Sequence, residues 1–328
     1  MKELSDLDRL PANIIAGSLK AKMPQPDEYI RENIYDAEKY PFAQLNSRHF
    51  EDGFYLKLPK CCELKTPIHL LSLIVSEEIF ITHPRHFIVL EQGSSLTLVE
   101  EYVSLNNIDY VMNVVTTIHA DDEAKLHHYK IQHEGKRAAH FASHFVYQKK
   151  NSYFSQVNVS TGAQFARDDV LVQLMEPGAE CCTSGFYHTR YDHQTIDNHV
   201  DIRHQASHSN SHMLYKGIME NKSRAIFNGR LHVAKDAQHI LAYQANHNLL
   251  LSKQAEVYSK PELEIYADDV KCKHGATIGQ LNEEALFYLR SRGIPQDEAV
   301  NILLQGFAQD ILDRITHDGI RLRVEESL

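Results

Sequence analysis

Residues 234–265, AKDAQHILAYQANHNLLLSKQAEVYSKPELEI, place short apolar groups at loosely periodic intervals, with Asn and small residues between them. A parallel β-helix stacks groups of this kind coil upon coil into one continuous core. No strict hexapeptide repeat accompanies the groups. The periodicity therefore favours a β-solenoid only slightly over a β-sandwich or a barrel.

The same character extends over residues 51–280, which we predict to form the β core. Runs such as SLTLVEEYVSL, YVMNVVTTIHA and SYFSQVNVSTG are rich in Val, Ile, Leu, Tyr and Thr, and they end at Gly, Asp or Asn. Such runs are typical of short strands. No helix of normal length interrupts the series, which argues against a sheet built from βαβ units. The fold class is therefore mainly β.

Both ends of the chain read as helical. Residues 1–50 are expected to be a short helical and loop segment, in which Ile30, Ile34 and Ala37 line one helix face. Residues 281–328 are expected to be a helical domain. Asn282 can cap its first helix, Gly293 can close that helix, and a second helix should run from about Gln296 to Gly319.

The second C-terminal helix has an apolar stripe with an acidic rim. Its acids include Asp297 and Glu298, and the apolar stripe consists of Val300, Leu303, Leu304, Phe307, Ile311 and Ile315. Two helices after a short turn can form a DNA-binding unit, but this helix has the wrong charge for phosphates. The pattern favours a protein partner.

The net charge of −10 over 328 residues argues against nucleic acid as a main partner, because phosphate contacts require clustered Lys and Arg. No apolar run approaches the roughly 20 residues that span a bilayer. The first residues do not resemble a secretory signal. We therefore expect a cytoplasmic protein that does not bind membranes.

The five cysteines are the adjacent pairs Cys61/Cys62 and Cys181/Cys182 and the lone Cys272. Adjacent pairs lack the spacing of common zinc sites, and an odd count suits a reducing compartment. We expect the paired cysteines to be small buried residues.

Histidine is abundant, with 21 in the chain. A histidine belt in the middle of the sequence suggests a β-rich metal-dependent enzyme as an alternative function, although no compact ligand motif is present. Neutral histidines on half-exposed strands are the simpler interpretation. The belt consists of His188, His193, His199, His204, His208, His212, His232, His239 and His247.

The stretch YADDVKCKHGA, residues 266–276, concentrates reactive side chains. On a strand, Cys272 and His274 share one face, while Lys271 and Lys273 share the other. Two residues do not complete a four-ligand zinc or iron–sulfur site. The pair is therefore not metallic, or another chain supplies the missing ligands. A Cys–His nucleophile and base is a further option, although no orienting group is evident.

Residues 248–307, from NLLLSKQAEVYS to VNILLQGF, resemble the SufB/SufD family, whose members assemble iron–sulfur clusters. Residues 197–238 resemble the same family, and residues 83–102 and 40–59 do so more weakly. Gly275–Ala276–Thr277–Ile278–Gly279 stands where SufB-type sequences carry EATTS, which favours the SufD branch. The first 50 residues are shorter than the N-terminal domain usual in that branch.

The resemblance implies a right-handed parallel β-helix that pairs with SufB, and C-terminal helices that bind the SufC ATPase. It implies that Cys272 and His274 lie at the SufB junction and act there as metal ligands that share a transient iron–sulfur cluster with SufB. The expected SufC-binding residues are Val300, Leu303, Leu304, Phe307, Ile311, Asp297 and Glu298.

We therefore expect a non-enzymatic scaffold subunit without a cofactor in the isolated chain. The sequence contains no GxxxxGK[ST] phosphate loop, so ATP hydrolysis is assigned to the partner. A homodimer is a further possibility for the isolated chain. The alternatives are the metal-dependent enzyme described above and a purely structural interaction module in which Cys272 is inert.

Overall fold

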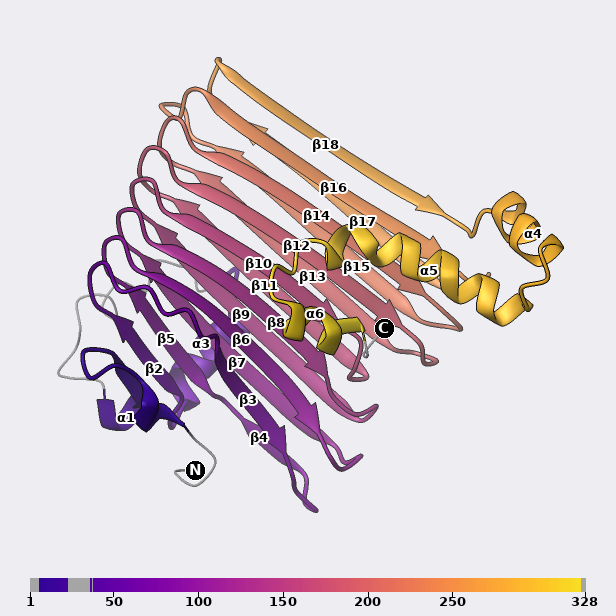
Figure 1. Ribbon diagram of the computed structural model, residues 1–328, viewed down its shortest axis with the longest axis horizontal. Coiled ribbons are helices and arrows are strands. Elements are labelled where there is room, and N and C mark those ends of the chain that lie inside the picture. The colour runs from indigo at the N-terminus through magenta and orange to yellow at the C-terminus, as the bar shows by residue number, and fades with distance from the viewer. Residues whose placement is uncertain (1–5, 23–35, 37, 326–328) are drawn as a thin grey trace.

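The computed structural model describes residues 6–22, 36 and 38–325. Its main body is a β-solenoid made of two long sheets that face each other, as Figure 1 shows. From β5 onward, successive long strands alternate between the sheets, so each coil of the chain contributes one strand to each. The sheets are parallel except where β1 pairs antiparallel with β2. The solenoid expectation is confirmed, and the sandwich and barrel are excluded.

Sheet A has ten strands and sheet B has eight. In order of pairing, sheet A consists of β1 (Ile15–Ser18), β2 (Phe54–Leu58), β5 (Arg85–Leu90), β7 (Tyr110–Ala120), β9 (Ala138–Gln148), β11 (Phe165–Leu174), β13 (Thr195–His204), β15 (Arg224–Val233) and β17 (Glu256–Ile265), with β4 (Phe80–Thr82) also paired to β7. Sheet B consists of β3 (Ile68–Ile74), β6 (Ser95–Ser104), β8 (Lys125–His133), β10 (Tyr153–Ser160), β12 (Glu180–Thr189), β14 (Asn210–Met219), β16 (Ile240–Leu250) and β18 (Val270–Gly279).

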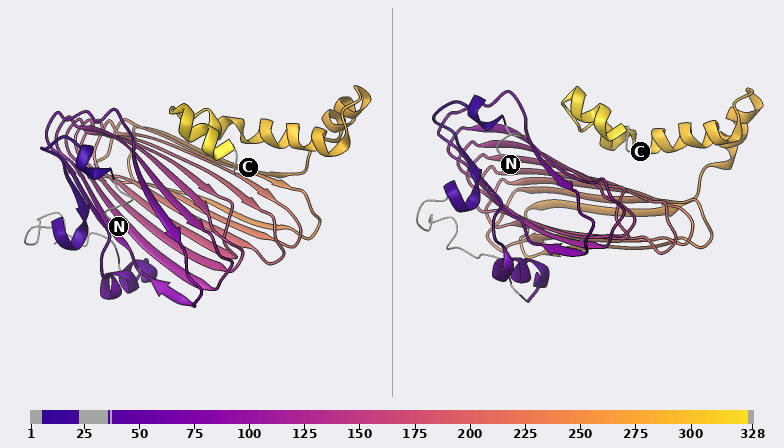
Figure 2. Two further views of the ribbon diagram at one scale, coloured as in Figure 1. Left: turned by 60° about the horizontal axis from the view of Figure 1, so that its bottom comes forward. Right: turned by 90° about the horizontal axis from the view of Figure 1, so that it is seen from below.

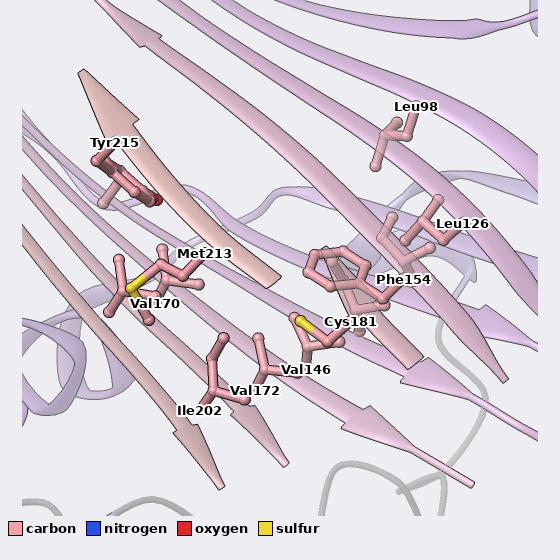
Figure 3. Close-up of a cluster of buried hydrophobic side chains, with 14 of the residues drawn as sticks. Leu98, Leu126, Val146, Phe154, Val170, Val172, Cys181, Ile202, Met213 and Tyr215 are labelled. Atoms are coloured by element: carbon pink, nitrogen blue, oxygen red, sulfur yellow. The ribbon is translucent and has the colours of Figure 1, made fainter. Parts of the chain in front are cut away.

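The apolar core fills part of the space between the sheets. Because pairing is in register, equivalent side chains of successive coils stack into rows. Leu126, Phe154 and Cys181 form such a row on sheet B, and Val172 and Ile202 belong to one on sheet A (Figure 3). All five are buried. The rows join the coils into one hydrophobic cluster.

The rest of the interior is polar. Lys130 is completely buried, and its Nζ lies 2.5 Å from a carboxylate oxygen of Asp168, which is also buried. Strands of both sheets thus direct some polar side chains into the interior of the solenoid. A buried charge needs a charged or hydrogen-bonding partner in such an environment, and this pair supplies one.

Buried tyrosines pack against glycines in neighbouring coils. A Cβ at Gly185 would lie 2.2 Å from the ring of Tyr215, and a Cβ at Gly217 would lie 2.0 Å from the ring of Tyr187. Only glycine leaves space for an aromatic ring at these two positions.

Three belt histidines, which were expected on strands, lie instead at the corners of the solenoid between strands. His193, His208 and His239 have φ values of 61°, 59° and 59°. The N–H of His208 donates to the carbonyl oxygen of Gln238 at 2.9 Å, and the two corner rings of His208 and His239 stack with centroids 4.7 Å apart. These three side chains therefore belong to stacked turns.

The cysteine expectation holds only for Cys181, which is buried. Cys61 is exposed and has a φ of 56°. Cys62 and Cys182 are half-buried. Cys182 follows an inward-facing residue on its strand and therefore faces outward.

The N-terminal segment contains η2 (Leu7–Arg9), α1 (Leu19–Lys22) and α3 (Pro41–His49). It also contains β1, which the sequence analysis did not predict and which extends sheet A. Ile30, Ile34 and Ala37 lie outside the described residues.

The C-terminal helices are α4 (Glu283–Ser291), α5 (Gln296–Leu312) and α6 (Asp318–Glu325). Asn282 caps α4 by accepting the N–H of Ala285 at 3.0 Å, as predicted. The expected end of the second helix at Gly319 is wrong: α5 ends at Leu312, and Ile315 packs onto sheet B before α6 begins. Figures 1 and 2 show α5 and α6 along the outer face of sheet B and α4 projecting beyond it. In the part of the chain that the structure describes, no helix is long and apolar enough to cross a membrane.

Candidate functional site at the open end of the solenoid

The two sheets end at β17 and β18, the last strands of the solenoid. Each pairs with a preceding strand on one side, and no other described strand pairs with the opposite edge. Their outer backbone N–H and C=O groups are therefore available to another chain. An uncovered strand edge of this length is a template for pairing.

Cys272 and His274 lie on this last coil in inward-facing rows. Cys272 pairs in register with Ala242, which is buried, and packs against the main core. Burial raises the pKa of the Cys272 thiol. His274 pairs with the fully buried Gln244 but is itself exposed, because no further coil covers it. Their Cα atoms are two residues apart on a strand, a separation of roughly 7 Å.

The row that ends at His274 can be followed in register from β8 to β18 of sheet B. Over these six strands its members are His128, Gln156, Thr183, Met213, Gln244 and His274. The first five are buried and only the last is exposed. His274 is thus the terminal member of an interior row that is mostly polar.

The neighbouring lysines face the outside of sheet B. Lys271 and Lys273 line a surface pocket of about 330 Å³ together with Cys182, His212 and Tyr243. Cys272, between the two lysines, packs inward. The strand therefore separates the thiol from the two ammonium groups, which lie on the opposite face.

The predicted partner stripe divides into two parts. Leu304, Phe307 and Ile311 pack on the outer face of sheet B in one hydrophobic cluster with Phe186 and Leu214. Val300 and Leu303 are only partly buried, and Asp297 and Glu298 are exposed. The exposed positions lie nearer the start of α5, next to α4.

Polar contacts hold the C-terminal helices on the sheet. Nζ of Lys216 donates to the carbonyl oxygen of Phe307 at 2.9 Å and pairs with Asp310. Arg323 pairs with Glu101 at 2.8 Å. In contrast, α4 has no buried residue, and its Phe287 side chain is 74% exposed.

The histidine belt does not assemble into one site. Nε2 of His188 lies 2.7 Å from Glu220, and Nε2 of His199 lies 2.8 Å from Asp197. His204 is buried between two serine hydroxyls. Among the residues that the structure describes, the potential three-ligand metal group contains no belt histidine; its members are Glu100, His128 and His144. The sequence pattern does not reveal this group, because polar residues that alternate with apolar ones on a strand are typical of a half-exposed face.

Comparison with known proteins bears directly on this architecture. The family model described as "SUF system FeS cluster assembly, SufBD core domain" matches residues 73–307, which include the solenoid strands from β4 to β18 and much of the C-terminal helical segment. The chain belongs to the SufBD family.

Individual relatives agree with this assignment. An iron–sulfur cluster assembly SufBD family protein of Synechocystis is 33% identical over 87% of this chain and 65% of the relative. The iron–sulfur cluster assembly protein SufD of Escherichia coli is 33% identical over 78% of this chain and 60% of its own length. Protein ABCI7, chloroplastic, of Arabidopsis thaliana is 33% identical over 85% and 60%, respectively. The matches thus span about three fifths to two thirds of these SufBD relatives, and the SufD resemblance is confirmed.

Proposed function

We propose that this SufBD-family chain is a scaffold subunit for iron–sulfur cluster assembly that pairs with a SufB-type chain through the open end of its solenoid. The observation that carries the proposal is the exposed last coil, on which Cys272 and His274 end two inward-facing rows. The free edges of β17 and β18 supply backbone donors and acceptors for a second chain. Without SufB, a second copy of this chain is the competing occupant of the same edge.

The chemistry of the pair suits a shared, transient cluster. A thiolate and an imidazole are both iron ligands, but a cluster usually takes four protein ligands. The SufB-type chain would supply the others. Burial raises the pKa of the Cys272 thiol, so binding of iron must drive loss of its proton. A ligand set completed only in the complex allows release when the complex opens.

We assign SufC binding to the projecting part of the C-terminal domain. The inner parts of α5 and α6 are occupied by contacts with sheet B, which leaves α4 and the first turns of α5 for a partner. Exposed Phe287 supplies apolar surface, and Asp297 and Glu298 supply negative charge. Val300 and Leu303 of the apolar stripe are partly accessible and lie in the first half of the same helix.

The scaffold itself is not assigned catalysis or a resident cofactor. Because this sequence has no P-loop motif, ATP hydrolysis would come from SufC. A conformational change in SufC would be transmitted to the cluster site through the solenoid, because Lys216 holds α5 on sheet B.

Co-expression with SufB and SufC tests the proposal. We expect a stable complex of all three chains that contains iron and acid-labile sulfide after reconstitution. The test variant is Thr277→Arg on the exposed edge strand, which should block pairing while the chain stays folded. A variant inside the solenoid, such as Asn246→Ala, would disturb folding and is not used. Isolation of this chain alone, or a complex that tolerates Thr277→Arg, would contradict the assigned interface.

A further inference from the structure

We propose that the interior of the solenoid holds a second site, in which Glu100, His128 and His144 bind one divalent transition-metal ion of the Zn²⁺ or Fe²⁺ class. His128 and His274 belong to the same row but are five strands apart. At about 4.8 Å per strand this separates them by roughly 24 Å. The interior site is therefore distinct from the open end and goes beyond the proposed scaffold function.

Three strands bring the ligands together across the interior. Glu100 comes from β6 and His128 from β8 in sheet B, and His144 comes from β9 in sheet A. Nε2 of His128 lies 3.1 Å from Oε1 of Glu100, and Nε2 of His144 lies 3.7 Å from Oε2. A tetrahedral ion with bonds of about 2.0–2.1 Å has ligand atoms about 3.3 Å apart. The two separations, which run to different oxygens of Glu100, lie on either side of that value, and one ligand atom from each of the three residues lies within 4.8 Å of the other two.

The ligand atoms are buried, and their nearest polar partners are one another. Glu100 and His128 are 0% exposed and His144 is 1% exposed. Across the described ranges, no hydrogen bond of good geometry is found for Oε1 of Glu100, Nε2 of His128 or either ring nitrogen of His144, although the first two atoms lie 3.1 Å apart. Buried polar atoms are nearly always partnered. A bound ion would satisfy several of these atoms at once.

The chemistry of the three side chains also suits a cation. A carboxylate and two imidazoles are donor groups that Zn²⁺ and Fe²⁺ take in proteins. All three are buried together, and their candidate ligand atoms lie within 4.8 Å of one another.

Neighbouring side chains can orient the ligands. The Tyr102 hydroxyl donates to Oε2 of Glu100 at 2.8 Å, and the Thr116 hydroxyl donates to it at 3.2 Å. The amide nitrogen of Gln156 lies 3.1 Å from Nδ1 of His128. Rotation of this amide by 180° would bring its oxygen to the same place, where Nδ1–H would donate to it and Nε2 of His128 would keep a lone pair for a metal. Partners of this kind fix the tautomer and orientation of metal-ligating histidines.

A nearby carboxylate provides a matched comparison. Glu134 is also buried, with His140 at 2.8 Å. Its two oxygens, however, accept hydrogen bonds from Tyr110 at 2.8 Å and Gln132 at 2.9 Å. Both oxygens of Glu134 are thus satisfied by protein donors, although the ring nitrogens of His140, like those of His144, have no hydrogen bond of good geometry. We assign no ion to Glu134 because, among the described residues, it does not belong to a group of three potential ligands.

Cobalt(II) is the probe for the test. The full chain carrying Cys272→Ser and His274→Ala, which removes the two ligands proposed at the open end, is titrated with Co²⁺ when folded and is also refolded with Co²⁺ present. Refolding allows loading even if the native interior is closed. We expect about one ion per chain, a visible spectrum typical of tetrahedral nitrogen and oxygen ligands, and displacement by Zn²⁺.

Ligand and control variants then locate the ion. Glu100→Gln and His144→Gln should each weaken Co²⁺ binding by more than about 100-fold, beyond the 10- to 100-fold loss typical of outer-shell changes. Glu134→Gln should bind as the parent does. The metal should raise the Tm of the parent and of Glu134→Gln but not of the two ligand variants.

Three results would overturn the site: no Co²⁺ bound after either loading method, binding retained in Glu100→Gln, or equal loss in Glu134→Gln. Glu100→Gln removes a buried charge and should fold without metal, as checked by circular dichroism. If it does not fold, His144→Gln decides the outcome by the same two measurements. Absence of binding with normal folding would identify Glu100, His128 and His144 as a purely structural polar cluster.

Discussion

Gln244 and His274 are register partners on β16 and β18, yet Gln244 is fully buried and His274 is exposed. The difference arises from position: another strand covers Gln244, whereas the described structure ends its pairing at β18. An imidazole in an inward row thus becomes accessible where the solenoid stops. A second chain that continued the pairing would bury His274 at the joint.

Substitutions at the open end should distinguish the proposed metal ligands, Cys272 and His274, from the residues beside them. His274→Ala should leave complex formation intact but weaken iron retention by at least about tenfold, because a ligand is lost. His274→Cys should restore part of it, since thiolate also binds iron. Cys272→Ser should have a milder effect if partner ligands compensate. Iron and sulfide analysis of the purified complex measures these changes.

The adjacent lysines serve as controls for those variants. Lys271 and Lys273 line the outer pocket, so Lys271→Ala and Lys273→Ala should leave cluster content close to that of the parent complex. Loss of the cluster in the lysine variants together with retention in His274→Ala would contradict the ligand assignment.

Gly275 should matter for assembly rather than for the fold. No atom lies within 4 Å of a Cβ built at this position. Gly275→Val should therefore leave the Tm of the isolated chain nearly unchanged and reduce co-purification with SufB, because the added branches stand on the outer face of the edge strand, beside the incoming chain. Equal loss of folding and assembly would indicate that this glycine has a structural role in the isolated chain.

The acidic start of α5 should contribute to SufC binding. Asp297 and Glu298 are exposed, so Asp297→Lys with Glu298→Lys should weaken SufC capture without unfolding the chain. Asp313→Lys, an exposed charge reversal after the end of α5, is the matched control. Pull-down at two salt concentrations measures the effect. Equal capture of SufC by the parent chain, the double variant and the control would exclude a role for this acidic surface in SufC binding.

The periodicity of residues 234–265 and the helix punctuation around Asn282 were sufficient to predict a mainly β core and the start of α4. The family resemblance was needed to choose the solenoid over a sandwich, because apolar spacing does not identify which strands pair. The end of α5 was misplaced because Ile315 continues the apolar stripe, although the chain has already left the helix to pack on sheet B.

The interior polar groups were beyond sequence reasoning for a different reason. Polar residues that alternate with apolar ones usually mark a solvent-facing side of a strand. In this solenoid a polar residue can instead face the covered interior. Lys130 does so and donates a hydrogen bond there to Asp168, which lies 38 residues further along the chain. Only three-dimensional pairing reveals such partners. Spacing did place Cys272 and His274 on one face, and the structure adds that this face ends an open coil.

The packing of Gly185 under Tyr215 predicts a sharp size limit. A Cβ there would lie 2.2 Å from the ring, so Gly185→Ala should destabilise the chain by about 1–3 kcal/mol or more through overpacking. Gly275→Ala, with open space around it, should change stability by no more than about 0.5 kcal/mol. Urea denaturation measures both, and similar stability of the two variants would refute the packing argument.

His204 should make the solenoid sensitive to acid. Its side chain is 0% exposed, and its ring nitrogens lie 2.8 Å from the Ser209 hydroxyl and 2.9 Å from the Ser211 hydroxyl. Burial, with a smaller effect from His232, lowers the pKa of His204 to about 4. An unfolded histidine has a pKa of about 6.5, so between these values the unfolded chain binds a proton that the folded chain does not.

The stabilisation from neutral His204 should therefore be complete above about pH 6.5 and should disappear as the pH falls through about 4, a loss of about 3 kcal/mol at most. His204→Gln removes this titration while keeping a polar side chain between the serines. The substitution should cost stability at pH 7, and the gap between the two proteins should narrow as the pH falls to 4.5. Urea denaturation at several pH values measures the gap, and parallel stability curves for the two proteins would show that His204 does not carry this acid sensitivity.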